Sequence, residues 1–199
     1  MNDIKEYPKR FVTNKGKKVI IRLPEIGDFD QLHGYINELV DEDTTIMRNQ
    51  KVSQKEERDY LSGILEAVKE NEGFNLLAFN GGKLVANVSV ERKQYRQKHL
   101  GVLGIAIIKD FRNEGLGTEL LKQAIILSNN FLKLKILVLS TFSTNKRAIH
   151  LYREMGFKKC GGWPKGVFYK GKYIDDNFMY LNLDHAKLVL TSSTARRQN

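Results

Sequence analysis

The 199-residue sequence predicts a single α/β domain, with a mixed and mostly antiparallel central sheet of about seven strands and about four flanking helices. Three observations lead to this prediction. Short β-branched and apolar runs recur along the chain, stretches with apolar residues at helical spacing lie between them, and glycine turns or helix-capping residues separate the two kinds of segment. With 41% hydrophobic residues, the chain can fill one core.

Runs of β-branched and apolar residues predict the strands. Gly81-Gly82 and Lys170-Gly171 each lie between two such runs, and because these turns tolerate positive φ, each predicts an antiparallel hairpin. The run 99–108 is almost wholly apolar, which predicts a central strand covered on both faces. The predicted strands are residues 18–23, 74–79, 84–90, 99–108, 135–141, 157–169 and 172–183.

Capping residues and helical spacing predict the helices. Ser53 and Glu56 form a capping box at the start of the second helix, and Asn145 is the N-cap of the last one. Glycines are predicted to end these two helices, at Gly73 and at Gly156. The predicted helices extend from Asp28 to about residue 41, from Ser53 to Gly73, from Leu116 to Leu127 and from Asn145 to Gly156.

One domain is predicted over residues 18–185, with an N-terminal extension over residues 1–17 and a flexible tail over residues 186–199. The longest apolar run, 136–139, is far shorter than the ~20 residues of a membrane span, and the polar start lacks a signal-peptide region. We therefore expect a cytoplasmic protein with no membrane partner. Because Cys160 is the only cysteine, we expect neither an internal disulfide nor a metal site built from thiols.

The chain is strongly basic, with a formal net charge of +10 and a pI of about 9.6. Such a charge attracts polyanions, which include nucleic acids, acidic membranes and the phosphates of a nucleotide cofactor. The lysines and arginines are spread along the chain without interleaved aromatic residues, so we interpret them as a solvated surface and predict no specific nucleic acid partner. A basic nucleic-acid-binding protein stays as an alternative that only the net charge supports.

A glycine loop at residues 112–117 joins the strand 99–108 to the third helix. The first N–H groups of a helix have no internal acceptor and the helix dipole is positive there, so such a junction can bind an anion. Gly115 and Gly117 would let the backbone approach phosphates closely. The spacing fits neither the Gly-x-Gly-x-x-Gly of a dinucleotide site nor the Gly-Lys-Ser/Thr of a nucleoside triphosphatase.

Two segments resemble motifs of the GNAT N-acetyltransferases. Residues 105–118 are similar to motif A, whose signature is Gln/Arg-x-x-Gly-x-Gly/Ala, and residues 145–157 are similar to motif B, Asn-x-x-Ala-x-x-x-Tyr-x-x-x-Gly-Phe. The resemblance covers roughly residues 18–183. It implies direct transfer of an acetyl group from acetyl-CoA to a primary amine in a ternary complex, and a sheet that splays between its fourth and fifth predicted strands, where the cofactor enters. No metal is implied.

The resemblance also implies the residues that bind the cofactor. Backbone groups of Ile105, Ala106 and Ile107 would bind the acetyl carbonyl and pantetheine, where a fixed N–H can stabilise the charge that develops on the oxygen. Glu114 departs from the family pattern, in which a basic or neutral residue is common at this position. A carboxylate near phosphates is repulsive unless it points to solvent. The pyrophosphate is assigned to Arg112, Asn113, Glu114, Gly115, Leu116, Gly117 and Thr118.

Motif B carries a second set of roles. Asn145 can both cap its helix and contact the cofactor, and Tyr152, two helical turns on, lies on the same face. In the family this tyrosine is the general acid that protonates the thiolate of coenzyme A. A buried core tyrosine is the alternative interpretation. The sequence assigns no strong general base, since the positions that carry glutamate in some relatives correspond to Gly101 and Ser140.

His99 and Glu91 are weak candidates for a base that acts directly or through water, and an amine that arrives neutral would need none. Asp175 or Asp176 could hold a cationic acceptor, although solvated carboxylates near a turn are an equal alternative. The acceptor stays open: a protein N-terminus or lysine, a polyamine or another small amine. A homodimer is also left open. Because no glutamate base was found, a non-catalytic acyl-CoA-binding regulatory module remains the first alternative.

Overall fold

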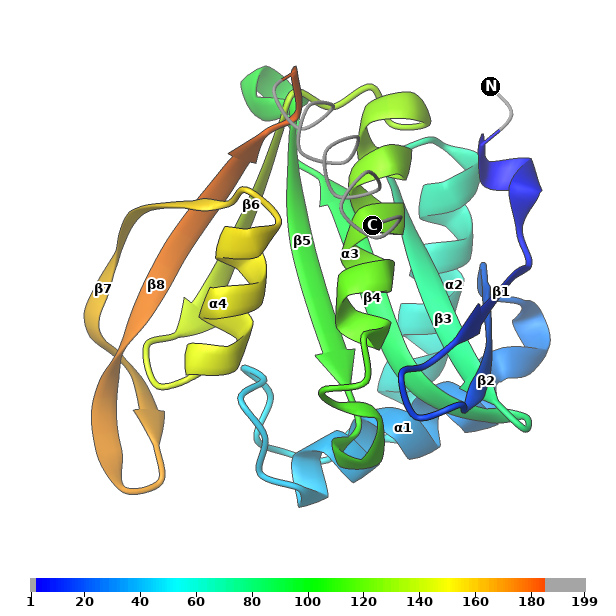
Figure 1. Cartoon of the computed structure of the whole chain (residues 1–199), viewed down its shortest axis with the longest axis horizontal. Helices are drawn as coiled ribbons and strands as arrows, with labels where there is room; N and C mark the ends of the chain where they lie inside the picture. Colours follow the sequence, from blue (N-terminus) through cyan, green and yellow to red (C-terminus); the bar gives the residue numbers. More distant parts are fainter. Residues whose placement is uncertain (1–2, 185–199) are drawn as a thin grey trace, which may run out of the picture.

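The computed structural model describes residues 3–184, which form one eight-stranded sheet in the order β1-β2-β3-β4-β5-β6-β8-β7 (Figure 1). Neighbouring strands are antiparallel except for β5 and β6, which are parallel. The predicted mixed, mostly antiparallel sheet is therefore confirmed, with one strand more than expected. The strands are β1 Lys9–Val12, β2 Lys18–Arg22, β3 Gly73–Asn80, β4 Lys83–Arg92, β5 Leu100–Ile107, β6 Ile136–Phe142, β7 Lys158–Tyr169 and β8 Lys172–Asn182.

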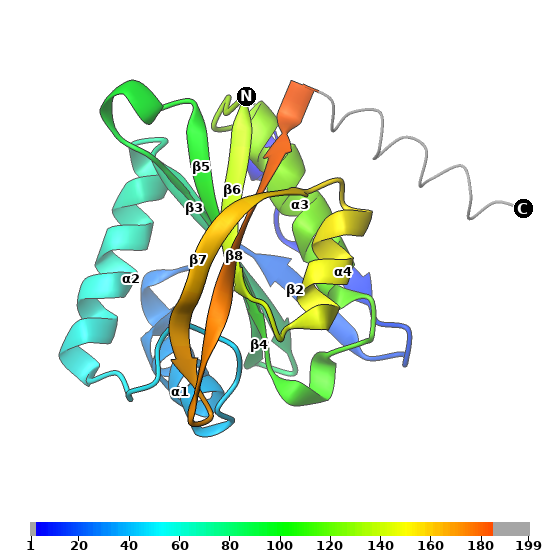
Figure 2. The ribbon, with the colours of Figure 1, turned by 90° about the vertical axis from the view of Figure 1, so that its left-hand side faces the viewer.

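In the described part of the chain, four α-helices cover the two faces of the sheet, as predicted. Helix α2 lies on one side, with α1 packed beside it, and α3 and α4 lie on the other side (Figure 2). Within residues 3–184 no helix is both long and apolar enough to cross a membrane. The α-helices are α1 Phe29–Asp41, α2 Gln54–Lys69, α3 Leu116–Asn130 and α4 Lys146–Glu154, and the short 3-10 helices are η1 Asp3–Glu6, η2 Ile26–Asp28, η3 Tyr95–Gln97 and η4 Lys109–Phe111.

The additional strand, β1, lies in the segment 1–17 that the sequence analysis treated as an extension without strand or helix. It pairs antiparallel with β2 at the edge of the sheet. Its four residues are alternately half-buried and exposed, so they are too few and too weakly apolar to stand out in the sequence. Tertiary contacts hold the segment in place, since the Tyr7 hydroxyl and the Lys9 ammonium both donate to Gln123 Oε1 on α3 at 3.0 Å. The predicted tail 186–199 lies outside the described residues.

Helix α2 begins as predicted but ends earlier. Ser53 Oγ accepts from the Glu56 backbone N–H at 3.3 Å, and the Glu56 carboxylate accepts from the Ser53 N–H at 2.9 Å, which completes the capping box. The prediction that Gly73 ends this helix is wrong, because Gly73 is the first residue of β3. A side chain there would clash, since its Cβ would lie 2.8 Å from the carbonyl oxygen of Val90 on the neighbouring strand.

The splay predicted between the strands 99–108 and 135–141 is confirmed. Strands β5 and β6 pair only at Leu100, Gly101 and Val102 with residues 136–138, and they separate toward their C-terminal ends (Figure 1). The expectation that β5 is covered on both faces is wrong, because Val102 is 42% exposed and Gly104 is also exposed. The face of β5 that carries these two residues is thus partly open.

Candidate functional site

The glycine loop turns the chain into α3 beside the C-terminal end of β5 (Figure 1). Asn113 and Gly115 adopt left-handed backbone conformations, with φ of +61° and +81°, and Gly115 is the N-cap of α3. At Gly117 a Cβ would lie 3.1 Å from Leu151 Cδ2 and 3.2 Å from Ile107 Cδ1, so this glycine also lets α3 pack closely against α4 and β5. The free N–H groups of the first turn of α3 therefore lie next to the splay.

From the sequence, we expected the Glu114 carboxylate to repel a phosphate unless it pointed to solvent. The Glu114 side chain does not point to solvent. It is fully buried, and its carboxylate accepts hydrogen bonds from Thr13 Oγ1 at 2.9 Å and Lys17 Nζ at 2.8 Å, with Lys15 Nζ at 3.4 Å. The Lys17 ammonium, against the effect of burial, lowers the pKa of Glu114. The two lysines of the β1–β2 turn thus neutralise this carboxylate and Thr13 adds a hydrogen bond, so the carboxylate need not repel a phosphate.

The same turn also holds the loop backbone, because the Asn14 N–H donates to the Glu114 carbonyl at 3.0 Å. The lysines at positions 15, 17 and 18 belong to the basic residues that we interpreted from the sequence as a solvated surface. The signal that could have linked these lysines to the loop was the carboxylate of Glu114, which departs from the family pattern in motif A. The interpretation failed because the pairing joins segments about one hundred residues apart in the sequence.

The Arg112 side chain, predicted to contact a phosphate, is engaged within the protein. Its Nε donates to the Ile107 carbonyl at 2.7 Å, and its guanidinium forms an ion pair with Glu42 at the end of α1. A phosphate contact would have to compete with this ion pair. The backbone of the loop, rather than this side chain, is the better candidate for holding an anion.

Backbone directions decide which groups of β5 face the splay. The Ala106 carbonyl and the Ile108 N–H are both turned toward the β4 side, to Tyr35 and Val85 respectively. Successive residues of a strand point their backbone groups to opposite edges. The N–H groups of Ile105 and Ile107 therefore face the side of β6, whereas Ala106, which was assigned the same role from the sequence, points the other way.

Tyr35 on α1 is a residue that the sequence analysis missed. Its hydroxyl donates to the Ala106 carbonyl at 2.7 Å and accepts from the Asn87 N–H at 3.1 Å, so it bridges β4 and β5 within the ladder. Burial raises the pKa of Tyr35 and keeps the phenol neutral. Because the hydroxyl satisfies two backbone groups of the sheet, it fixes the position of the strand to which the acetyl group was assigned.

Motif B has the predicted local structure. Asn145 Oδ1 accepts from the Ala148 N–H at 3.2 Å, which confirms the helix cap, and its Nδ2 donates to Thr45 Oγ1 at 2.6 Å. Tyr152 is 6% exposed and its ring lies 5.8 Å from that of Phe157. Burial raises the pKa of Tyr152 to about 12, so the phenol keeps its proton at neutral pH.

The two base candidates lie far from the segment that was assigned the acetyl group. His99 is exposed in the turn before β5, eight residues from Ile107, which corresponds to roughly 26 Å along a strand. Glu91 pairs with Val102, four residues from the Asn87–Ala106 pair, or roughly 13 Å. These separations disfavour direct proton transfer by either residue at Ala106, and relay through water stays the prediction for Glu91.

The two aspartates of the final hairpin differ in their surroundings. Asp175 is exposed and its carboxylate accepts from the Lys165 N–H at 2.9 Å. Asp176 is 4% exposed, it bonds to the Ser140 side chain, and its Oδ1 has no hydrogen-bond partner within the described chain. Burial raises the pKa of Asp176. Strand β8 therefore brings a buried carboxylate to Ser140, one of the positions where a base was sought.

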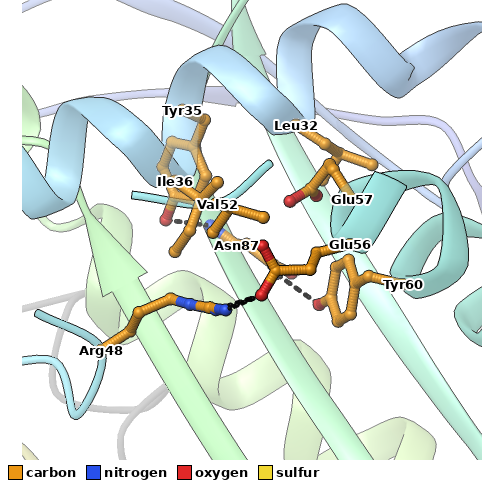
Figure 3. A pocket seen from close by; sticks show the side chains of 9 residues that line it. All are labelled: Leu32, Tyr35, Ile36, Arg48, Val52, Glu56, Glu57, Tyr60 and Asn87. Carbon is orange, nitrogen blue, oxygen red and sulfur yellow. Dashed lines mark hydrogen bonds and ion pairs between the residues drawn. The ribbon is translucent and has the colours of Figure 1, made fainter. Parts of the chain in front are cut away.

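A cavity of about 390 Å³ lies between α1, α2 and β4 (Figure 3). It reaches the β4–β5 ladder at Tyr35 and Asn87, and its mouth carries an ion pair between Arg48 and Glu56 at 2.6 Å. No group of three or more potential metal ligands is present among residues 3–184. The lining residues are Leu32, Tyr35, Ile36, Arg48, Val52, Glu56, Glu57, Tyr60 and Asn87.

These features describe an α/β protein with a glycine loop beside a splayed sheet and a cavity on the opposite face. Residues 35–157 match the model of the acetyltransferase (GNAT) family. The chain therefore belongs to this family, which confirms the resemblance found in the sequence.

Known relatives agree with this assignment. The chain is 28% identical to the L-amino acid N-acetyltransferase AaaT of Escherichia coli (strain K12) over 105 residues, which cover 52% of this chain and 65% of that protein. A GNAT-family acetyltransferase from Streptococcus pneumoniae has a similar structure, with a TM-score of 0.74 and 28% identity over 82% of this chain and 99% of that one. The structure of yncA from Salmonella typhimurium with its cofactor acetyl-CoA shares the fold, with a TM-score of 0.73 and 20% identity over 84% and 95% of the two chains.

Proposed function

We propose that the protein transfers the acetyl group of acetyl-CoA to the primary amine of an acceptor. The observation that carries this proposal is the splay of β5 from β6, which pair at only three positions, beside the free N–H groups at the start of α3. Membership of the GNAT family and the acetyl-CoA in the structure of yncA support the choice of cofactor.

The residues of the site take the following roles in this proposal. The amides between Arg112 and Thr118 bind the diphosphate, while Asn145 lies at the start of α4 on the other side of the splay. The Ile105 or Ile107 N–H, which faces the side of β6, donates to the acetyl oxygen. Holding both reactants in one complex replaces a bimolecular encounter by an oriented attack.

The acetyl transfer itself requires one nucleophile and one acid. The lone pair of the neutral amine forms a bond to the acetyl carbon, and the backbone N–H stabilises the resulting oxyanion. When the oxyanion collapses, the carbon–sulfur bond breaks and the sulfur leaves as a thiolate. Tyr152 donates its phenolic proton to that thiolate and regains a proton from water, and the proton lost by the amine goes to a carboxylate or to water. Coenzyme A and the N-acetylated acceptor are the products.

Thiol release tests this proposal. The protein is incubated with acetyl-CoA and a panel of acceptors that includes amino acids, aliphatic amines, polyamines and peptides with free N-termini, and free coenzyme A is measured. We expect thiol release that depends on both protein and acceptor. Binding of acetyl-CoA without thiol release from any acceptor would instead favour the non-catalytic acyl-CoA-binding module.

Two further expectations belong to this proposal. We place the protein in the cytoplasm, and the free, exposed thiol of Cys160 is compatible with a reducing compartment. A homodimer stays a prediction, which sedimentation of the protein at micromolar concentration would test.

A further inference from the structure

Glu57 on α2 is a buried carboxylate without a partner. It is 3% exposed and lines the cavity, toward which its carboxylate points (Figure 3). Among residues 3–184 no hydrogen bond or ion pair involves its side-chain oxygens. Burying a charge is costly unless a hydrogen bond or an opposite charge compensates it. The Glu57 carboxylate is therefore unfavourable for folding, and its oxygens face only the cavity.

The charges around Glu57 leave the cavity negative. Arg48 from the α1–α2 connection is the one cation in the lining, and it is already paired with Glu56 at 2.6 Å. His33 and Arg48 act on Glu57 from a distance, the Glu56 carboxylate opposes them, and Tyr60 is a neutral phenol. Burial outweighs these effects and raises the pKa of Glu57. One negative charge of the lining is therefore unbalanced whenever Glu57 is ionised.

The rest of the cavity is suited to an apolar group. Leu32 and Ile36 of α1 and Val52 before α2 form its apolar walls. A volume of about 390 Å³ lies within the usual range of small-molecule sites, roughly 300 to 1,000 Å³. A fitting ligand therefore combines one positive charge with a compact apolar body.

We propose that this cavity binds a small primary amine that carries a net positive charge and an apolar body, and that Glu57 is the counter-ion of its ammonium group. The inference rests on the proposed function, because it names the class of acceptor for the acetyl transfer. The bound ammonium loses one proton to water before it attacks, because only the neutral amine has a lone pair to form the new bond. Tyr35 and Asn87 line the cavity, and the Tyr35 hydroxyl donates to the Ala106 carbonyl and accepts from the Asn87 N–H. A ligand held here therefore lies against the β4–β5 ladder.

The charge balance also separates two classes of acceptor. A free amino acid brings a carboxylate into the cavity, and that group would have to take Arg48 from Glu56 or remain unpaired. An amine without a carboxylate only neutralises Glu57. We therefore expect amines to be preferred over the corresponding amino acids, whereas the relative AaaT is named for L-amino acids.

Calorimetric titration of the full chain without acetyl-CoA tests the site independently of catalysis. The probes are 3-methylbutylamine, its neutral counterpart 3-methylbutan-1-ol, and L-leucine, which has the same branched side chain plus a carboxylate. We expect the amine to bind at least about tenfold more tightly than the other two. In Glu57→Gln the amine should lose about 30-fold or more in affinity, as for a desolvated charge pair, while the alcohol binds as before.

Two variants serve as controls for these titrations. Glu66→Gln removes an exposed carboxylate from the same helix, and it should bind the amine as the parent protein does. Glu57→Asp keeps the charge and should retain part of the affinity. Because the Glu57 oxygens have no partner, Glu57→Gln should not lower the melting temperature. Equal binding of amine and alcohol, undetectable binding of the amine, or a loss in Asp176→Asn instead of Glu57→Gln would each overturn the inference.

Thiol-release kinetics separate this inference from the proposed function. We expect Glu57→Gln to raise KM for 3-methylbutylamine about 30-fold and to leave KM for acetyl-CoA within about twofold. If no acceptor releases thiol but the amine still binds through Glu57, the proposed function fails and the site stands. If acceptors release thiol equally well with Glu57→Gln, the function stands and the inference fails.

Discussion

The two buried glutamates of this protein, Glu114 in the glycine loop and Glu57 on α2, differ in their surroundings. Glu114 is in contact with Thr13, Lys15 and Lys17, and its pKa is lowered, chiefly by the hydrogen bond from Lys17. Glu57 has no such partner within the described chain, and its pKa is raised by burial. Equal burial therefore leads to opposite preferences for the charged form.

The difference teaches what each carboxylate does. A paired carboxylate stabilises the fold around it, so Glu114 supports the loop that is proposed to bind the cofactor. An unpaired one costs stability unless a ligand brings the missing charge, so Glu57 indicates a binding site. The carboxylate on the proposed cofactor side, Glu114, is thus paired with lysines. The carboxylate on the proposed acceptor side, Glu57, has no counter-ion within the described chain until a ligand binds.

The largest effect should come from Tyr152→Phe, which changes neither glutamate. Removing the hydroxyl deletes the proposed acid but keeps the buried ring, so we expect kcat to fall about 100-fold with KM for acetyl-CoA almost unchanged. Steady-state thiol release measures both constants. An unchanged kcat would show that the tyrosine is only a core residue.

The second effect concerns Tyr35, which joins the acceptor cavity to the cofactor strand. In Tyr35→Phe the Asn87 N–H and the Ala106 carbonyl lose a buried partner, and we expect a loss of about 2 kcal/mol in the free energy of unfolding. Urea denaturation measures this change. Tyr173→Phe, at a position that is 69% exposed, is the control and should have almost no effect. Similar unfolding of the two variants would contradict the bridging role.

The third prediction tests the paired carboxylate, Glu114. Glu114→Gln removes the charge that Lys15 and Lys17 neutralise, so the loop should be held less well and KM for acetyl-CoA should rise about tenfold. Since the pKa of Glu114 is lowered in the folded state, its contribution is present above the unfolded pKa and is lost as pH falls through the folded pKa. Melting curves should therefore show a deficit at pH 7 that shrinks in acid. A deficit independent of pH would contradict the charge pairing.

The smallest effect should come from Glu57→Gln, which we expect to gain stability at high pH, whereas Glu114→Gln should lose it. The pKa of Glu57 is raised in the folded state, so its ionisation costs stability as pH rises above the unfolded value of about 4.3. We expect the variant to be more stable than the parent at pH 8, on the order of 1 kcal/mol, and the gain to vanish near pH 4. Urea denaturation at the two pH values checks this. A destabilised variant would mean that Glu57 has a partner inside the protein.

Local patterns in the sequence were sufficient for most of the fold. The capping box at Ser53 and the cap at Asn145 are set by residues a few positions apart. The splay was predicted only because the resemblance to the GNAT family implies it. The four-residue strand β1 was missed because long-range pairing, and not its own pattern, keeps it extended.

The site was less predictable for the same reason. The glycine loop could be located from its motif, but the partners of Glu114 and Arg112 come from distant segments. Tyr35 and Glu57 occupy ordinary helical positions, and nothing in the sequence distinguishes a tyrosine that bridges two strands or a glutamate that faces a cavity. Only the packing of α1 and α2 against β4 gives these side chains their roles.

The most direct test of the account is a crystal structure of the protein with coenzyme A. We predict that the diphosphate lies within hydrogen-bond distance of backbone N–H groups between Arg112 and Thr118, with the pantetheine in the splay between β5 and β6. A diphosphate bound elsewhere, or a loop occupied by a side chain of the protein while coenzyme A binds at another surface, would contradict it.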